Sequence, residues 1–141
     1  MRIVLDSNVL ISGVFFSGPP YTILKAWRDG EIQRVVSPEI FQEYQRVAEE
    51  LSDKFPGIDI SDVLNLLLAR AEMVNAEPLP RQVCADADDD KFIACAAAGS
   101  SRLIVSGDKH LLDISPYQKI TVIKPRQFVD KYLLSRTHDN E

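Results

Sequence analysis

Residues 84–99 read CADADDDKFIACAAAG, so a dense acidic run passes directly into an alanine-rich apolar segment. After Asp90, both sides of the helix that this segment predicts are apolar, through Phe92, Ile93, Ala94, Ala96 and Ala97. Such a helix is largely buried, and at least one carboxylate is therefore expected where it enters the protein. A carboxylate in that position requires a cation, hydrogen-bond donors or a proton.

Two structural roles compete for the acids of this run. Asp88 or Asp89 is a suitable N-cap, and the helix dipole favours any acid in the first turn, so one or two of the aspartates are expected to serve the helix start. The alternating acids also have the spacing of an EF-hand calcium loop. That interpretation is disfavoured because Lys91 replaces the turn glycine and Ala97 replaces the closing glutamate.

The composition is that of an ordinary soluble domain. The chain has 141 residues, of which 45% are hydrophobic and 26% charged, and no apolar run approaches a membrane span. It begins with a strand-like segment that lacks the features of a signal peptide, which predicts a cytoplasmic location. Cys84 and Cys95 form neither a CxxC pair nor a metal cluster and are expected to be reduced, buried residues.

The net charge of −5 argues against a protein whose whole surface binds nucleic acid, because lysine and arginine supply most non-specific affinity for phosphates. It leaves room for a local basic rim. If several acids gather at one site, bound divalent cations would reverse the sign of the charge there.

Short apolar stretches alternate with helical patterns along the chain. Strands are predicted at 2–5, 34–37, 73–75, 102–106 and 119–123, and helices at 9–14, 20–29, 38–51, 61–71, 91–98, around 111–112 and at 125–133. This alternation predicts an α/β three-layer sandwich with a mainly parallel central sheet of about five strands. We expect one domain over residues 1–134, followed by a polar C-terminal tail at 135–141.

Acids stand at the ends of two predicted strands. Asp6 follows the first strand and Asp108 follows the fourth, and ligands of open α/β sheets bind beyond the carboxyl ends of the strands. If these strands are neighbours, the two carboxylates converge, and Asp90 and Glu43 can complete the cluster. Such an all-oxygen set suits Mg²⁺ or Mn²⁺. For Asp6, a simple helix cap is an equally good explanation.

Four short motifs, in order and at suitable separations, resemble those of the PIN-domain family. They are 1–10 (MRIVLDSNVL), 40–44 (IFQEY), 90–94 (DKFIA) and 106–108 (SGD). Each motif is weak alone, but together they are specific, and the resemblance covers about residues 1–134. It is strongest to VapC-like toxins.

The resemblance implies roles for particular residues. Asp6, Asp90 and Asp108 would be direct or water-mediated metal ligands, and Glu43 would be a ligand or a base that orients water. Ser7, Asn8 and Ser106 would be donors that orient these carboxylates, although turn capping explains them equally well. Contacts to RNA phosphates fall to Lys91, Lys109 and His110, for each of which a solvated surface position is the alternative.

One departure from the family pattern affects the acids. Many prokaryotic relatives have a further acid shortly after the fourth, where this chain has His110 and Leu111. Asp86, Asp88 and Asp89 are nearby substitutes, and the sequence does not distinguish among them.

The function that the resemblance implies is a ribonuclease dependent on Mg²⁺ or Mn²⁺, most often the toxin of a toxin–antitoxin pair, with an antitoxin partner and a homodimeric state. The competing hypothesis is a PIN-fold module that binds metal, RNA or protein without turnover. Two other phosphate-handling sites fit less well. A haloacid-dehalogenase site expects an acid where this chain has Asn8, and a receiver domain expects an acid pair near the first strand.

Overall fold

A parallel five-stranded sheet forms the centre of the computed structural model, which describes residues 1–54, 56–57 and 60–134. The strands are β1 (Arg2–Leu5), β2 (Gln33–Val36), β3 (Glu72–Met73), β4 (Leu103–Val105) and β5 (Thr121–Ile123). Their order is β3-β2-β1-β4-β5, and every pair is parallel. The predicted α/β fold class is confirmed.

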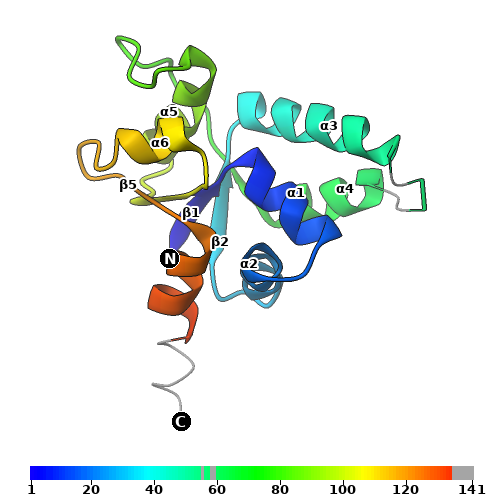
Figure 1. Ribbon diagram of the computed structural model, residues 1–141. Helices are drawn as coiled ribbons and strands as arrows, with labels where there is room; N and C mark the ends of the chain where they lie inside the picture. The colour runs from blue at the N-terminus through cyan, green and yellow to red at the C-terminus, as the bar shows by residue number, and fades with distance from the viewer. Residues whose placement is uncertain (55, 58–59, 135–141) are drawn as a thin grey trace.

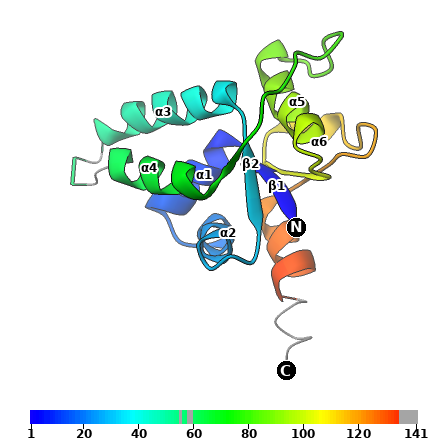
Figure 2. The same ribbon diagram turned by 180° about the vertical axis from the view of Figure 1, so that it is seen from behind.

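Helices cover both faces of this sheet, as Figures 1 and 2 show from opposite sides. The helices are α1 (Ser7–Phe15), α2 (Pro19–Arg28), α3 (Pro38–Ser52), α4 (Ile60–Arg70), α5 (Asp90–Ala98), α6 (Lys109–Asp113) and α7 (Pro125–Phe128), with the 3₁₀ turn η1 (Ala87–Asp89) and the π-helical turn η2 (Val129–Leu134). In both views α1 to α4 lie on one side of β1 and β2, and α5 and α6 lie on the other. None of the helices in the described part of the chain is both long and apolar enough to cross a lipid bilayer.

The central strand β1 pairs with β2 on one side and with β4 on the other. The chain leaves β1 into α1 on one face of the sheet and leaves β4 into α6 on the other, as Figure 1 shows. The prediction that the first and fourth strands are neighbours is therefore confirmed. The gap beyond their carboxyl ends is the topological switch point at which open α/β sheets bind ligands.

Helix α3 is fixed to the end of β1 by a buried tyrosine. The hydroxyl of Tyr44 donates a hydrogen bond to the backbone carbonyl of Leu5, the residue before Asp6. Burial raises the pKa of Tyr44 to about 12, so this hydroxyl keeps its proton. The Arg34 guanidinium, itself buried, lies over the rings of Trp27 and Tyr44, 5.0 and 5.6 Å from their centroids.

Some predicted boundaries were wrong. Helix α1 begins at Ser7 rather than Val9 because the chain turns immediately after β1. The last strand is shorter than 119–123, since Tyr117 and Ile120 exchange backbone hydrogen bonds of 2.9 and 2.8 Å in a tight antiparallel turn before it. The predicted tail at 135–141 lies outside the described residues.

Candidate active site

Asp6 lies directly after β1 and is almost completely buried, with 6% of its surface exposed. Its Oδ2 accepts a hydrogen bond of 2.7 Å from the Ser106 hydroxyl, which comes from the end of the neighbouring strand β4. Although Asp6 is at the N-cap position of α1, its side chain makes no capping hydrogen bond. The interpretation of Asp6 as a helix cap was therefore wrong, and its carboxylate faces the switch point.

Burial raises the pKa of Asp6, and the carboxylates of Asp108 and Glu43 raise it further. The Ser106 hydroxyl and the Ser7 backbone oppose this rise, but burial outweighs them. Asp6 is thus a carboxylate whose negative charge the surrounding protein does not fully compensate.

Ser106 links the first strand to the fourth. Besides donating to Asp6, its Oγ accepts a 2.9 Å hydrogen bond from the backbone N–H of Asp108. The Asp108 Oδ1 in turn accepts from the backbone N–H of His110 at 2.8 Å, which caps α6. The serine holds both chain segments in place, as expected for a residue that orients the acids.

Glu43 reaches the same region from α3, and its side chain is 12% exposed. One carboxylate oxygen accepts a hydrogen bond from the Ser7 hydroxyl, and the other lies 2.6 Å from Lys91 Nζ. The Ser7 hydroxyl thus contacts one of the acids expected at the site. The side chain of Asn8 is exposed and makes no hydrogen bond to another residue within the described ranges.

Asp89, at the end of η1, faces the acids at the strand ends. Its Oδ2 is buried and has no hydrogen-bond partner among the described residues, and His110 Nδ1 lies 3.4 Å from it. Burial raises the pKa of Asp89 to about 6. The carboxylates of Asp108, Asp86 and Asp6 raise it further, and the His110 side chain opposes the rise. An unpaired buried carboxylate oxygen among other acids is an arrangement that a cation would stabilise.

Asp90 is directed elsewhere. Its two oxygens accept hydrogen bonds from the backbone N–H groups of Val83 and Cys84, at 2.9 and 2.7 Å. Burial alone would raise the pKa of Asp90, but these donors outweigh it and hold the pKa below its ordinary value. Both oxygens of this expected ligand are thus occupied by backbone of the preceding loop.

The remaining acids and bases of the run have separate roles. Asp86, rather than Asp88 or Asp89, caps the helical turn by accepting from the Asp88 backbone N–H at 3.0 Å. The Asp88 carboxylate pairs with Lys91 Nζ at 3.1 Å. Lys109 is exposed and makes no ion pair with a described residue.

The tightest set of ligand atoms includes a histidine. Asp86, Asp89 and His110 each place one ligand atom within 4.8 Å of the others. Among the described residues, the four acids expected from the sequence do not form such a group. Asp89 belongs to this set and also interacts with Asp6 and Asp108, so it connects the two parts of what we call the acid centre: Asp6, Glu43, Asp86, Asp89 and Asp108.

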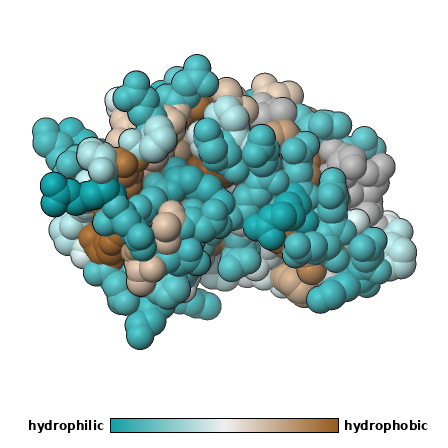
Figure 3. Space-filling view, turned by 90° about the horizontal axis from the view of Figure 1, so that it is seen from above, coloured by the Kyte–Doolittle hydropathy of each residue, from teal (hydrophilic) through white to brown (hydrophobic). Residues whose placement is uncertain are grey.

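The donor set of the acid centre fits a divalent cation. Carboxylate oxygens predominate, one of them is buried without a partner, and the pKa values of Asp6 and Asp89 are raised. The face above the strand ends is mostly hydrophilic in Figure 3, which views the molecule from above.

Asp89 is the residue that reasoning from the sequence missed as a leading candidate. The acidic run signalled its importance, but a shift of one position along a helix turns a side chain by about 100°. The choice between Asp89 and Asp90 depends on where the loop at Val83 and Cys84 lies, which the local pattern does not encode.

Comparison with known proteins identifies the fold and the family. A solved structure of VapBC2 from Rickettsia felis, bound to a DNA fragment from their promoter, contains a chain with the same fold, with a TM-score of 0.60 and 12% identity over 88% of this chain and 98% of that one. No curated protein sequence matches. The family model of the PIN domain matches residues 2–110, most of the described chain. The chain therefore belongs to the PIN-domain family.

Proposed function

We propose that this protein is a metal-dependent endoribonuclease that hydrolyses RNA phosphodiester bonds at the acid centre. The observation that carries the proposal is the buried Oδ2 of Asp89, which has no hydrogen-bond partner among the described residues and lies among the carboxylates of Asp6 and Asp108. A structural role would leave such an oxygen hydrogen-bonded, as it does for Asp90.

Asp6, Asp89 and Asp108 are the residues that we propose hold Mg²⁺ or Mn²⁺, directly or through water, with Asp86 and His110 at the edge. This revises the expectation from the sequence by placing Asp89 in the position given there to Asp90. When bound, the metal supplies Lewis-acid stabilisation of the phosphate and lowers the pKa of a coordinated water. Ser106 keeps Asp6 oriented toward the site.

Glu43 is proposed to orient the attacking water or accept its proton. Its carboxylate is positioned by the Ser7 hydroxyl and by Lys91 Nζ at 2.6 Å. Lys91 also reduces the repulsion that a phosphodiester would meet near Glu43. Lys109, exposed at the start of α6, is available for an adjacent phosphate.

We further propose that the protein is the toxin of a toxin–antitoxin pair and forms a homodimer. The support is family membership and the shared fold with a chain of VapBC2, whose structure contains a promoter DNA fragment. An antitoxin would then be the physiological protein partner. Co-expression with the product of a neighbouring gene and measurement of the mass of the purified complex tests this point.

The nuclease proposal is tested by incubating single-stranded and structured RNAs with wild type and Asp6→Asn, in Mg²⁺, Mn²⁺ or EDTA. We expect cleavage only with metal and only by the wild type. Equal cleavage by both proteins would identify a contaminating nuclease and contradict the assignment. Metal binding without cleavage of any RNA would favour the alternative function of a PIN-fold binding module.

A further inference from the structure

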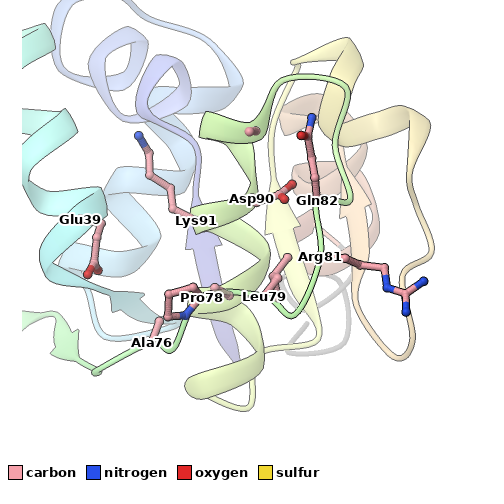
Figure 4. Close-up of a pocket in the computed structure, with 10 residues that line it drawn as sticks. Glu39, Ala76, Pro78, Leu79, Arg81, Gln82, Asp90 and Lys91 are labelled. Atoms are coloured by element: carbon pink, nitrogen blue, oxygen red, sulfur yellow. The ribbon is translucent and has the colours of Figure 1, made fainter.

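A hollow lies beside the acid centre, between α3, α5 and the segment 76–82. Its volume is about 360 Å³, within the range of small-molecule sites. One side is a helical stripe of Ala87, Asp90, Lys91 and Ala94, and the facing walls come from Glu39 and from Pro78 and Leu79. Figure 4 shows these side chains around the start of α5.

Lys91 makes this cavity continuous with the acid centre. Its aliphatic stem lines the cavity, while its Nζ lies 2.6 Å from the Glu43 Oε1. In Figure 4 the ammonium group points away from Pro78 and Leu79. A nucleotide next to a phosphodiester held at the acid centre would therefore lie near this cavity.

The hydrogen-bond acceptor that the lining side chains leave available to a ligand is a carboxylate. The Glu39 carboxylate lies on one wall. The Gln82 amide nitrogen donates hydrogen bonds to the backbone carbonyls of Cys84 and Ala85, at 2.9 and 3.2 Å, and in Figure 4 the amide points away from Pro78 and Leu79. The guanidinium of Arg81 points away from the other lining residues in Figure 4, and the Lys91 ammonium is paired with acids.

Apolar walls with acceptors suit a nucleobase better than a phosphate. Guanine, adenine and cytosine carry an exocyclic amino group that can donate to a carboxylate, and guanine adds a neighbouring ring N–H. Uracil has no amino group. Its single ring donor, N3–H, lies between two carbonyls, so the second oxygen of the Glu39 carboxylate would face a carbonyl oxygen. A base with an amino group would therefore fit the Glu39 carboxylate better than uracil.

We propose that this cavity binds the base of a nucleotide flanking the scissile phosphate, and that Glu39 selects bases carrying an amino group over uracil. The proposal rests on the ribonuclease function proposed above. It adds a determinant of substrate sequence, located on α3 and the segment 76–82 rather than among the acids of the centre.

Binding is tested separately from cleavage with uncharged nucleosides, which need neither metal nor phosphate contacts. In EDTA, we expect millimolar guanosine, adenosine and cytidine to shift the backbone NMR signals of Ala76, Leu79 and Ala94, and uridine to shift them little. Glu39→Gln should weaken guanosine binding roughly fivefold to tenfold. Equal shifts with uridine, or shifts located elsewhere, would overturn the proposal even if the protein is a nuclease.

Specificity is tested by mapping cuts in a randomised RNA with wild type, Glu39→Gln and Glu49→Gln. Glu49 is an exposed acid on the same helix outside the cavity, so its variant controls for the loss of one charge. We expect one position beside the cut to be depleted in uracil roughly tenfold, and only Glu39→Gln to remove this bias. Bias unchanged in that variant would contradict the proposal. Absence of cleavage by wild type would instead count against the nuclease function, and the nucleoside titration would still decide whether the cavity binds bases.

Discussion

Asp89 and Asp90 are adjacent in sequence but belong to regions with opposite electrostatic character. Asp89 lies in the acid centre, where burial and neighbouring carboxylates raise its pKa to about 6. The Asp90 carboxylate accepts hydrogen bonds from the backbone N–H groups of Val83 and Cys84, which lower its pKa although burial opposes them. The first region disfavours a negative charge, and the second stabilises one.

The difference separates a carboxylate available for chemistry from one used for structure. A ligand for a cation must have an oxygen that the protein leaves unpaired, and the Oδ2 of Asp89 meets that requirement. The Asp90 oxygens already have donors, and removing them would leave two backbone groups unsatisfied. Asp90 instead fixes the loop that forms one wall of the proposed base cavity.

The largest effect that tests this contrast is on cleavage. We expect Asp89→Asn to lower metal-dependent RNA cleavage by more than about 100-fold, beyond the usual effect of losing an outer partner of a metal ligand. Asp90→Asn should retain cleavage within about tenfold under conditions where it is folded. Rate measurements at saturating Mg²⁺ on one RNA check this, and the reverse ranking would return Asp90 to the metal site.

The next largest effect concerns Ser106. Ser106→Ala removes the hydroxyl that orients Asp6, and cleavage should fall by about 10- to 100-fold. Ser101→Ala is the matched control, since Ser101 is also buried and its Oγ donates only to backbone carbonyls, those of Arg2 and Leu103. Both variants should lose about 1 kcal/mol of stability in urea unfolding. Equal cleavage by the two would show that Ser106 is only structural.

The contribution of the Asp90 hydrogen bonds is tested by measuring stability to unfolding. Asp90→Asn should lower the free energy of unfolding by about 1–3 kcal/mol, because the amide retains only one acceptor oxygen for two charge-assisted hydrogen bonds. Asp89→Asn, measured in EDTA at pH 7.5, should leave stability unchanged or raise it. Chemical denaturation of both variants gives the comparison, and a destabilised Asp89→Asn would mean that the folded protein stabilises its carboxylate, for example through His110 Nδ1 at 3.4 Å.

The smallest effect is on how the free energy of unfolding depends on pH. It is measured for wild type and Asp89→Asn in EDTA from pH 3 to 8. Between its ordinary pKa of 3.8 and about 6, Asp89 keeps a proton in the folded protein that the unfolded chain has released. Wild type should therefore lose about 1–2 kcal/mol relative to Asp89→Asn as the pH rises through this window, an amount reduced by partial solvent access.

For Asp90 the sign is opposite. Its pKa is lowered by folding, so the stability it contributes is present above pH 3.8 and is lost as the pH falls through the folded value. At neutral pH, wild type should be more stable to unfolding than Asp90→Asn, and this advantage should shrink in acid. Wild type should be less stable than Asp89→Asn at neutral pH, and that deficit should also shrink in acid. If the free energy of unfolding changed with pH in the same way for both variants, the electrostatic difference between Asp89 and Asp90 would be contradicted.

The sequence predicted the architecture well because its evidence is local and repeated. Apolar strands such as 2–5 and 103–105 alternate with helices, and acids follow two of them, which is enough to infer a parallel sheet and the convergence of Asp6 and Asp108. The hydrogen bonds of Ser7 and Ser106 were likewise anticipated from their positions beside acids.

The choice among consecutive aspartates could not be made in that way. Asp86, Asp88, Asp89 and Asp90 have the same chemistry and differ only in direction, which depends on a 3₁₀ turn before α5 and on the loop at Val83. The burial of Lys91 against Glu43 also joins residues from separate helices. Such contacts between distant segments are not visible in a local pattern.

The pairing of β1 with β4 determines when the acid centre can form during translation. The hydrogen bond between Ser106 and Asp6 joins residues 100 positions apart, so the two segments meet only after nearly the whole domain has been synthesised. At typical elongation rates, roughly 5–20 s separate the appearance of the first segment from that of the second. Throughout that interval the growing chain carries Asp6 without Ser106 or Asp108. The acid centre is therefore absent while the ribosome is still reading most of the message.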